Sequence, residues 1–99
     1  MSYKNDIKMD THFEFNYKII DIINLLEKRL KLLKDLKDCH ENALIHYYER
    51  CLLENEQHLR NYNHPLLKNL FVCFCDYHFN QQHVDKIKGI IARLKTNNL

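Results

Sequence analysis

Apolar residues recur at helical spacing along most of the chain. From about residue 12 to residue 38 they follow one another at intervals of three and four, the spacing that gathers side chains on one face of a helix. Thr11 and Glu14 have the spacing of a capping box, so we expect this helix to begin at about His12. Without an internal glycine or proline, the pattern allows one long helix or two with a kink near Asn24. The apolar positions are Phe13, Tyr17, Ile19, Ile20, Ile22, Ile23, Leu26, Leu30, Leu33 and Leu36.

Two further amphipathic segments follow, joined by a hinge at residues 61–65. Asp38 and Glu41 provide a capping signal for a helix from Ala43 to Asn55 or further. Pro65 suits the first turn of another helix, because its missing N–H has no partner to lose there. The first segment places on one face Leu44, Tyr47, Tyr48, Cys51 and Leu52. The second continues with Leu66, Leu67, Leu70, Phe71, Phe74 and Phe79.

A last helix is expected from Gln82 to Lys95, with four residues facing inward: Val84, Ile87, Ile91 and Leu94. Gly89 lies inside it and should weaken it by about 1 kcal/mol relative to alanine. The chain has one glycine and one proline, too few for the turns of several hairpins. The sequence therefore predicts an all-α fold, a compact bundle of four to five helices. We expect a single helical domain at 11–97 after a polar N-terminal tail at 1–10.

Charge and hydropathy exclude several classes of function. The net charge of +2 gives no general argument for binding nucleic acid directly, and no apolar run reaches the roughly 20 residues that span a bilayer. The basic run at 27–38 alternates with leucines, which is typical of a solvated outer helix face. The N-terminus lacks the apolar core of a signal peptide, so we expect the four cysteines to be thiols in a reducing compartment.

The most metal-like pattern is formed by Cys73, Cys75, His78 and His83. Zinc requires four such ligands converging on one point, but in a helix the two cysteines point about 200° apart. Packing of Cys73 as a small apolar residue is the better interpretation. We therefore expect no metal and no other cofactor.

Cysteine–histidine catalysis would require an orienting polar group and an oxyanion site. Neither accompanies Cys39 and His40, nor Cys75 and His78. The sequence therefore predicts a protein that is not an enzyme.

The tyrosines leave two interpretations open. Tyr47, Tyr48, Tyr62 and Tyr77 each combine an apolar ring with a hydroxyl that requires a partner. They can lie at the edge of the core with their hydroxyls in water. Alternatively, they can line a groove for an extended or proline-rich peptide, whose ordering cost is low.

One pattern of aromatic and aliphatic residues extends from Tyr47 to Phe79. Its positions are Tyr47, Tyr48, Cys51, Leu52, Tyr62, His64, Pro65, Leu66, Leu67, Leu70, His78 and Phe79. The pattern resembles the Mediator complex subunit 31 family, whose block reads Y-L-x-Y-L-x-Y-W, then Y-P-x-C-L-x-x-L and a later H-F. Upstream, residues 12–15 (HFEF) are loosely similar to the opening R-F-x-x-E-L-E-F. The chain differs from the family pattern at Glu54, Gln57, Leu59 and Asn80, and lacks an asparagine-proline pair near Asn24.

The resemblance implies a non-enzymatic nuclear subunit in the middle module of Mediator, the coactivator of RNA polymerase II. Its expected partner is the N-terminal, proline-rich part of Mediator subunit 7, with no direct contact to nucleic acid or membrane. The expected partner-binding residues are Tyr47, Tyr48, Tyr62 and Pro65, supported from the core by Leu52 and Phe79. The alternative is a small helical adaptor, outside transcription, that self-associates or binds another protein.

Overall fold

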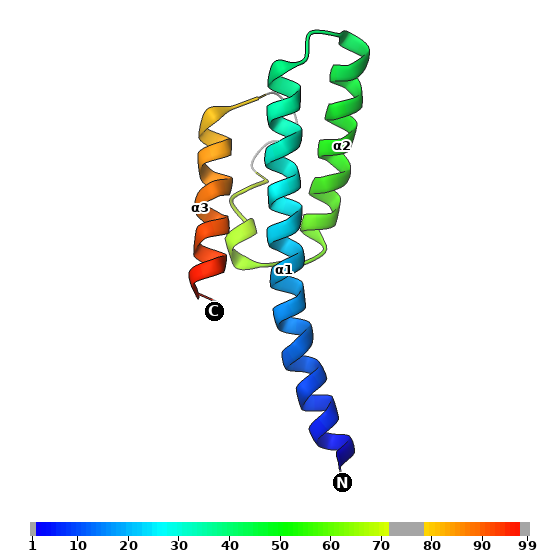
Figure 1. The fold of residues 1–99 in the computed structure, drawn as a ribbon, viewed down its shortest axis with the longest axis vertical. Coiled ribbons are helices and arrows are strands. Elements are labelled where there is room, and N and C mark those ends of the chain that lie inside the picture. Colours follow the sequence, from blue (N-terminus) through cyan, green and yellow to red (C-terminus); the bar gives the residue numbers. More distant parts are fainter. Residues whose placement is uncertain (1, 72–78, 98–99) are drawn as a thin grey trace.

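The computed structural model describes residues 2–71 and 79–97, with side chains from 18 to 71 and from 79 to 96. Three α-helices make up most of this part of the chain: α1 (Ser2–Asp38), α2 (Asn42–Arg60) and α3 (Gln81–Asn97). A short 3-10 helix, η1 (Pro65–Leu67), lies between α2 and α3. Helix α1 lies between the other two, which pack on its two sides (Figure 1). Within the described residues the predicted all-α class is confirmed, with three α-helices in place of the four to five helices predicted.

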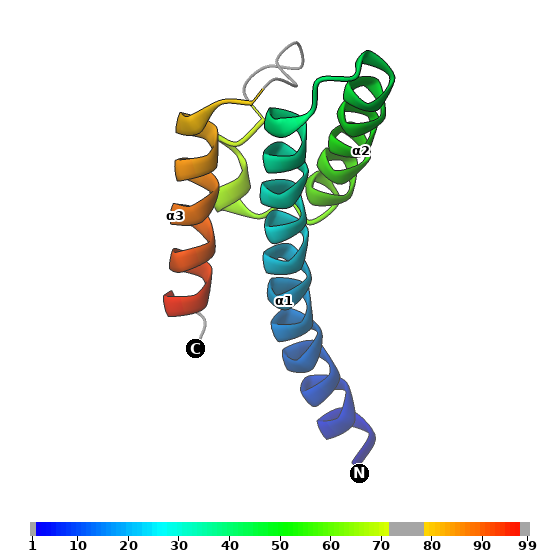
Figure 2. The same ribbon diagram turned by 45° about the horizontal axis from the view of Figure 1, so that its top comes forward.

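Helix α1 is one uninterrupted helix, so the alternative with a kink near Asn24 is wrong. It begins at Ser2, so the predicted start at His12 is also wrong, and most of the expected polar tail is helical. No glycine or proline stops the helix within these residues, and lysine and methionine favour it. The N-terminal part of α1 projects beyond α2 and α3 in both views (Figures 1 and 2), and the molecule measures 60 × 24 × 20 Å.

The core forms where α1 faces α2, the segment after it and α3. Its buried members are Ile19, Ile22, Leu26, Leu33, Leu36, Leu52, Leu59, Leu67, Leu70, Val84, Ile87, Ile90, Ile91 and Leu94. The four inward residues predicted for the last helix are all buried, which confirms its orientation. The assignment of Ile20 to the apolar stripe is wrong, since its side chain is 55% exposed. Ile20 lies about 200° around the helix from the buried Ile22.

In place of the helix expected after the hinge, the chain forms η1 and then turns as far as Phe71. Asn63 has a positive φ of 47°, and His64 is extended before proline. Pro65 occupies the first turn of η1 as predicted, and the His64 Nδ1 accepts a hydrogen bond of 3.2 Å from the backbone N–H of Leu66. Leu67 and Leu70 reach the core from these turns, so their burial does not require a longer helix. Phe74 lies outside the described residues.

Helix α2 begins at Asn42, one residue before the predicted start, and continues beyond Asn55 as the prediction allowed. Glu41 is its N-cap but forms no hydrogen bond to the helix through its side chain, so the predicted capping signal is wrong. The helix continues to Arg60 through the polar residues at 54–58. Two of those residues, Asn55 and Glu56, are buried against the rest of the molecule. They extend the buried face of the helix instead of ending it.

Candidate functional site

The centre of the bundle contains a buried arginine, Arg29 of α1, with a side chain 6% exposed. The sequence placed it in a solvated basic run, which is correct for Lys28 and Lys31 but wrong for Arg29. Arg29 follows the core residue Leu26 by three positions and precedes Leu33 by four, so it lies on the buried face of α1. A buried guanidinium must be compensated by acceptors from the neighbouring helices.

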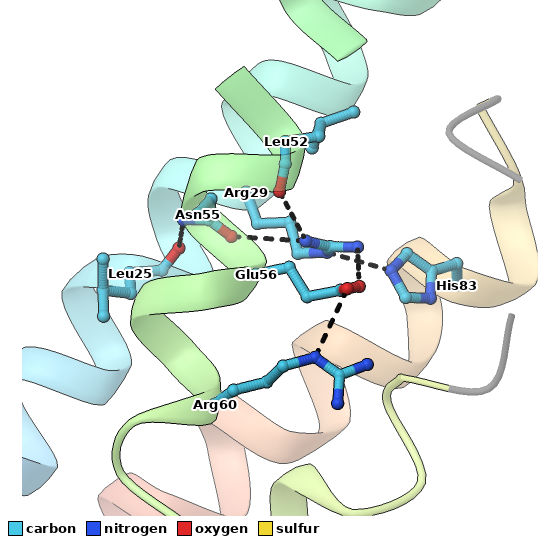
Figure 3. A network of polar contacts seen from close by, with 7 residues as sticks. All are labelled: Leu25, Arg29, Leu52, Asn55, Glu56, Arg60 and His83. Carbon is cyan, nitrogen blue, oxygen red and sulfur yellow. Dashed lines mark hydrogen bonds and ion pairs between the residues drawn. The ribbon is translucent and has the colours of Figure 1, made fainter. Parts of the chain in front are cut away.

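Helix α2 provides most of those acceptors. The Arg29 Nη2 lies 3.8 Å from the Glu56 Oε1, in an ion pair with both side chains buried. The Arg29 Nη1 donates to the Asn55 Oδ1 and to the Leu52 carbonyl, both at 3.4 Å (Figure 3). Asn55 donates in turn from its Nδ2 to the Leu25 carbonyl of α1 at 2.9 Å. These contacts fix the position of α2 along α1.

Glu56 is shared between two arginines. Its second oxygen, Oε2, lies 3.4 Å from the Nε of Arg60, one turn further along α2 (Figure 3). The Arg60 guanidinium also lies over the ring of Phe71, 4.5 Å from its centroid. The Glu56 carboxylate therefore pairs with the buried Arg29 through one oxygen. Through the other it pairs with the half-exposed Arg60, which stacks on the segment after η1.

Helix α3 joins the network through His83. The Arg29 Nε donates to the His83 Nε2 at 3.1 Å, so the ring must be neutral, with its proton on Nδ1. Burial lowers the pKa of His83 to about 4, and the charges of Arg29 and Lys86 act in the same direction. We define the polar network as Arg29, Asn55, Glu56, Arg60 and His83. It connects all three α-helices and lies at the centre of the fold.

The low pKa of His83 predicts a loss of stability in acid. The pKa is about 4 in the folded chain against 6.5 for the unperturbed ring. The unfolded chain therefore binds more protons between these values, and stability that is present above about pH 6.5 is lost as the pH falls towards 4. After discounting for the half-exposed ring, we expect a loss of about 1.5 kcal/mol. Urea unfolding at several pH values measures it.

His83→Gln is the control for this titration, because glutamine can still accept from Arg29 but does not titrate. Carboxylates also protonate in this range, so the difference between the two proteins isolates the histidine. The stability of the wild type relative to the variant should fall by about 1.5 kcal/mol as the pH falls from 7 to about 4. Parallel curves over the whole range would show that the ring does not contribute.

The charged groups of the polar network pair with one another inside the fold. We interpret the network as structural. The network was not predicted from the sequence, although the sequence contains a signal for it. Asn55 lies three positions after the buried Leu52 and four before Leu59, and Glu56 lies four after Leu52 and three before Leu59. Both therefore occupy core positions of α2.

Tyr47 and Tyr48 lie in the N-terminal half of α2, with Tyr47 57% exposed and Tyr48 half-buried. Their rings meet edge to face, with centroids 5.6 Å apart. A hydrogen bond with the neighbouring Cys51 is the main cause that raises the pKa of Tyr47. Leu44, one turn earlier, is also exposed. We name Leu44, Tyr47, Tyr48 and Cys51 the tyrosine face.

The other predicted contact residues lie elsewhere. The Tyr62 hydroxyl donates to the Asp21 Oδ2 at 3.0 Å, and the ring lines a hollow of about 330 Å³ with His58 and residues of α1. Pro65 lines a different groove, against α3. Leu52 is fully buried, and the ring of Phe79 lies 4.8 Å from the Lys37 Nζ. Tyr62 and Pro65 therefore line separate hollows, and Leu52 lies in the core beneath the surface of α2.

Most of the metal-like cysteine and histidine pattern falls outside the described part of the chain. Cys73, Cys75, Tyr77 and His78 lie outside it, and the described residues contain no cluster of three potential metal ligands. Among the described helices, none has the length and apolar character that a membrane span requires. Comparison of the chain with protein-family models, curated proteins and solved structures found no match.

Proposed function

We propose that the chain is a non-enzymatic helical subunit that acts through protein–protein contacts. The observation that carries the proposal is the tyrosine face of α2. On this face Leu44 and the Tyr47 ring are exposed to solvent, whereas the opposite side of the helix packs into the core. Exposed aromatic side chains beside aliphatic ones are enriched at the centres of protein interfaces. A neighbouring half-buried ring, Tyr48, holds Tyr47 in place and reduces the entropy lost on binding.

An elongated partner segment fits the spacing of the tyrosines. Residues 47, 51 and 58 follow one another at four and seven positions, so they lie along one flank of α2. His58 shares its hollow with Tyr62, which places that ring at the far end of the same flank. From Tyr47 to Tyr62 this flank is about 22 Å long, at a rise of about 1.5 Å per residue. About seven residues of polyproline II helix, at about 3.1 Å each, cover it.

The specific assembly in this proposal is the Mediator middle module in the nucleus, with the proline-rich N-terminal part of subunit 7 as the partner. Its support is the resemblance of the segment from Tyr47 to Phe79 and the all-helical fold. A proline-rich segment is extended before it binds, so it suits the length of this flank. In this assembly Tyr47 and Tyr62 make the contact, while the polar network keeps α2 fixed on α1.

The proposal predicts that Tyr47→Ala combined with Tyr62→Ala weakens partner binding by about thirtyfold or more, because aromatic anchors carry much of the energy of such interfaces. Titration calorimetry with the N-terminal segment of Mediator subunit 7 measures the affinity. Leu53→Ala, on another flank of α2, is the control and should bind normally. Thermal unfolding separates binding from folding, because Tyr62 also contacts Asp21. Unchanged binding by the double variant would show that the tyrosines do not make the contact.

Self-association is the second candidate, because the exposed Leu44 and Tyr47 side chains, one turn apart, could pack against the same face of a second copy. Two measurements separate the candidates. Purification of the tagged chain from its native cells, followed by mass spectrometry, should recover other Mediator subunits if the first proposal is correct. Sedimentation of the pure chain should show a concentration-dependent dimer, abolished by Tyr47→Glu, if the second is correct.

A further inference from the structure

Gly89 has no evident role in the fold of its own chain. It lies in the middle of α3, where glycine costs about 1 kcal/mol relative to alanine, and its φ is not positive. Apart from its two chain neighbours and the adjacent backbone of its own helix, no described atom lies within 4 Å of the position that a Cβ would occupy. Neither the backbone nor the packing of this helix therefore requires glycine, and the open space in front of it faces outward.

The space in front of Gly89 belongs to a groove of about 250 Å³ between α3 and the segment around η1. Pro65 and Leu66 form one wall, and Ile90 of α3 forms part of the other. Ile90 is buried and Leu66 half-buried, so the apolar surface of the groove continues into the core. This groove is separate from the tyrosine face, because α2 and α3 lie on opposite sides of α1 (Figure 1).

The charges at this groove have one sign. Lys86 and Arg93 line it at three positions before and four positions after Gly89, so all three share one face of α3. The Lys86 Nζ donates to the Asn69 carbonyl at 2.8 Å, which holds the cation at the edge of the groove. Among the described residues that line the groove there is no acidic side chain. A second copy of this face would bring like charges together, which disfavours self-association here.

We propose that this groove binds an acidic segment of a partner protein, whose backbone passes Gly89 at close range. The absence of a Cβ at Gly89 permits the close approach. One apolar side chain of the segment lies against Ile90 and Pro65, and carboxylates on either side pair with Lys86 and Arg93. An apolar wall with two cations suits such a peptide better than a nucleic acid, which requires a longer row of phosphate contacts.

The test uses a labelled peptide of about 15 residues. It consists of leucine, alanine and glutamate with the leucines at helical spacing, and a twin peptide has lysine in place of glutamate. Amide chemical shifts of the full chain locate binding, and fluorescence anisotropy gives the affinity. We expect the glutamate peptide to perturb Gly89 and its neighbours, and the lysine peptide to have no effect. Single-stranded DNA is the polyanion control and should bind at least about tenfold more weakly than the glutamate peptide.

Four variants complete the test. Gly89→Leu, and Lys86→Glu with Arg93→Glu, should each weaken binding by about tenfold or more. Lys88→Glu is the matched control, since Lys88 lies about 200° around the helix from Lys86, and it should bind normally. Gly89→Ala should raise the melting temperature by about 4 °C, which would confirm that glycine is not needed for folding. Absence of shifts near Gly89, or full affinity in Gly89→Leu, would overturn the proposal.

Discussion

Replacement of Arg29 by methionine should lower the free energy of unfolding by about 3–5 kcal/mol, the largest effect that we expect from a single substitution in this chain. The change removes the cation that Glu56 meets in the interior, where that carboxylate is only 5% exposed. It also leaves the Asn55 Oδ1 and the His83 Nε2 without the donor that Arg29 provides. The loss of stability therefore comes mainly from buried polar groups that are left without a hydrogen-bond partner. Urea unfolding monitored by circular dichroism measures it.

A double-mutant cycle tests this explanation. Arg29→Met combined with Glu56→Leu removes both charges and keeps the volume, so the double variant should be less destabilised than the sum of the single variants by at least about 1 kcal/mol. Lys31→Met, an exposed position on the same helix, is the control and should change stability by less than about 0.5 kcal/mol. Additive losses in the cycle would show that Arg29 and Glu56 act independently.

Two neighbouring leucines of α2 should respond very differently to truncation. Leu52→Ala should cost about 3 kcal/mol, because Leu52 is 0% exposed and its removal leaves a cavity beside α1. Leu53→Ala should cost less than about 1 kcal/mol, since Leu53 is 38% exposed and alanine favours a helix. Thermal or urea unfolding of the matched pair measures the difference. Equal losses would contradict the orientation of α2 on α1.

The same pair bears on the proposed partner contact. The resemblance assigned Leu52 a supporting role from the core. Because Leu52 is completely buried, Leu52→Ala would affect binding only by destabilising the packing of α2. The exposed Tyr47 can be changed without opening the core, so it is the sharper probe of the tyrosine face.

Much of the architecture could be predicted from local pattern. The long helix that ends at Asp38, the helix after Asn42 and the last helix follow from apolar spacing, which persists because helix geometry repeats along the chain. The ends were less predictable. Thr11 and Glu14 suggested a start for α1, but no glycine or proline precedes them and the helix begins at Ser2. The segment after Pro65 has helical spacing, but it reaches the core through turns.

The predicted partner site, too, could be predicted from the sequence only within a single helix. Helical period groups Tyr47 with Tyr48 and Cys51, and the structure keeps them together on α2. The sequence could not place Tyr62 against Asp21 or Pro65 against α3, because each contact joins residues far apart along the chain. Their positions depend on how the chain turns after Arg60.

By itself the sequence determined the all-α class, the approximate positions of the helices and the buried face of α3, since each depends on neighbours within a few residues. Only the tertiary structure decided that Arg29 is buried and not solvated. The charge of a side chain is local information, but its environment depends on whether Glu56 and His83 arrive from other helices to compensate it. The polar network therefore exists only once α2 and α3 have packed on α1.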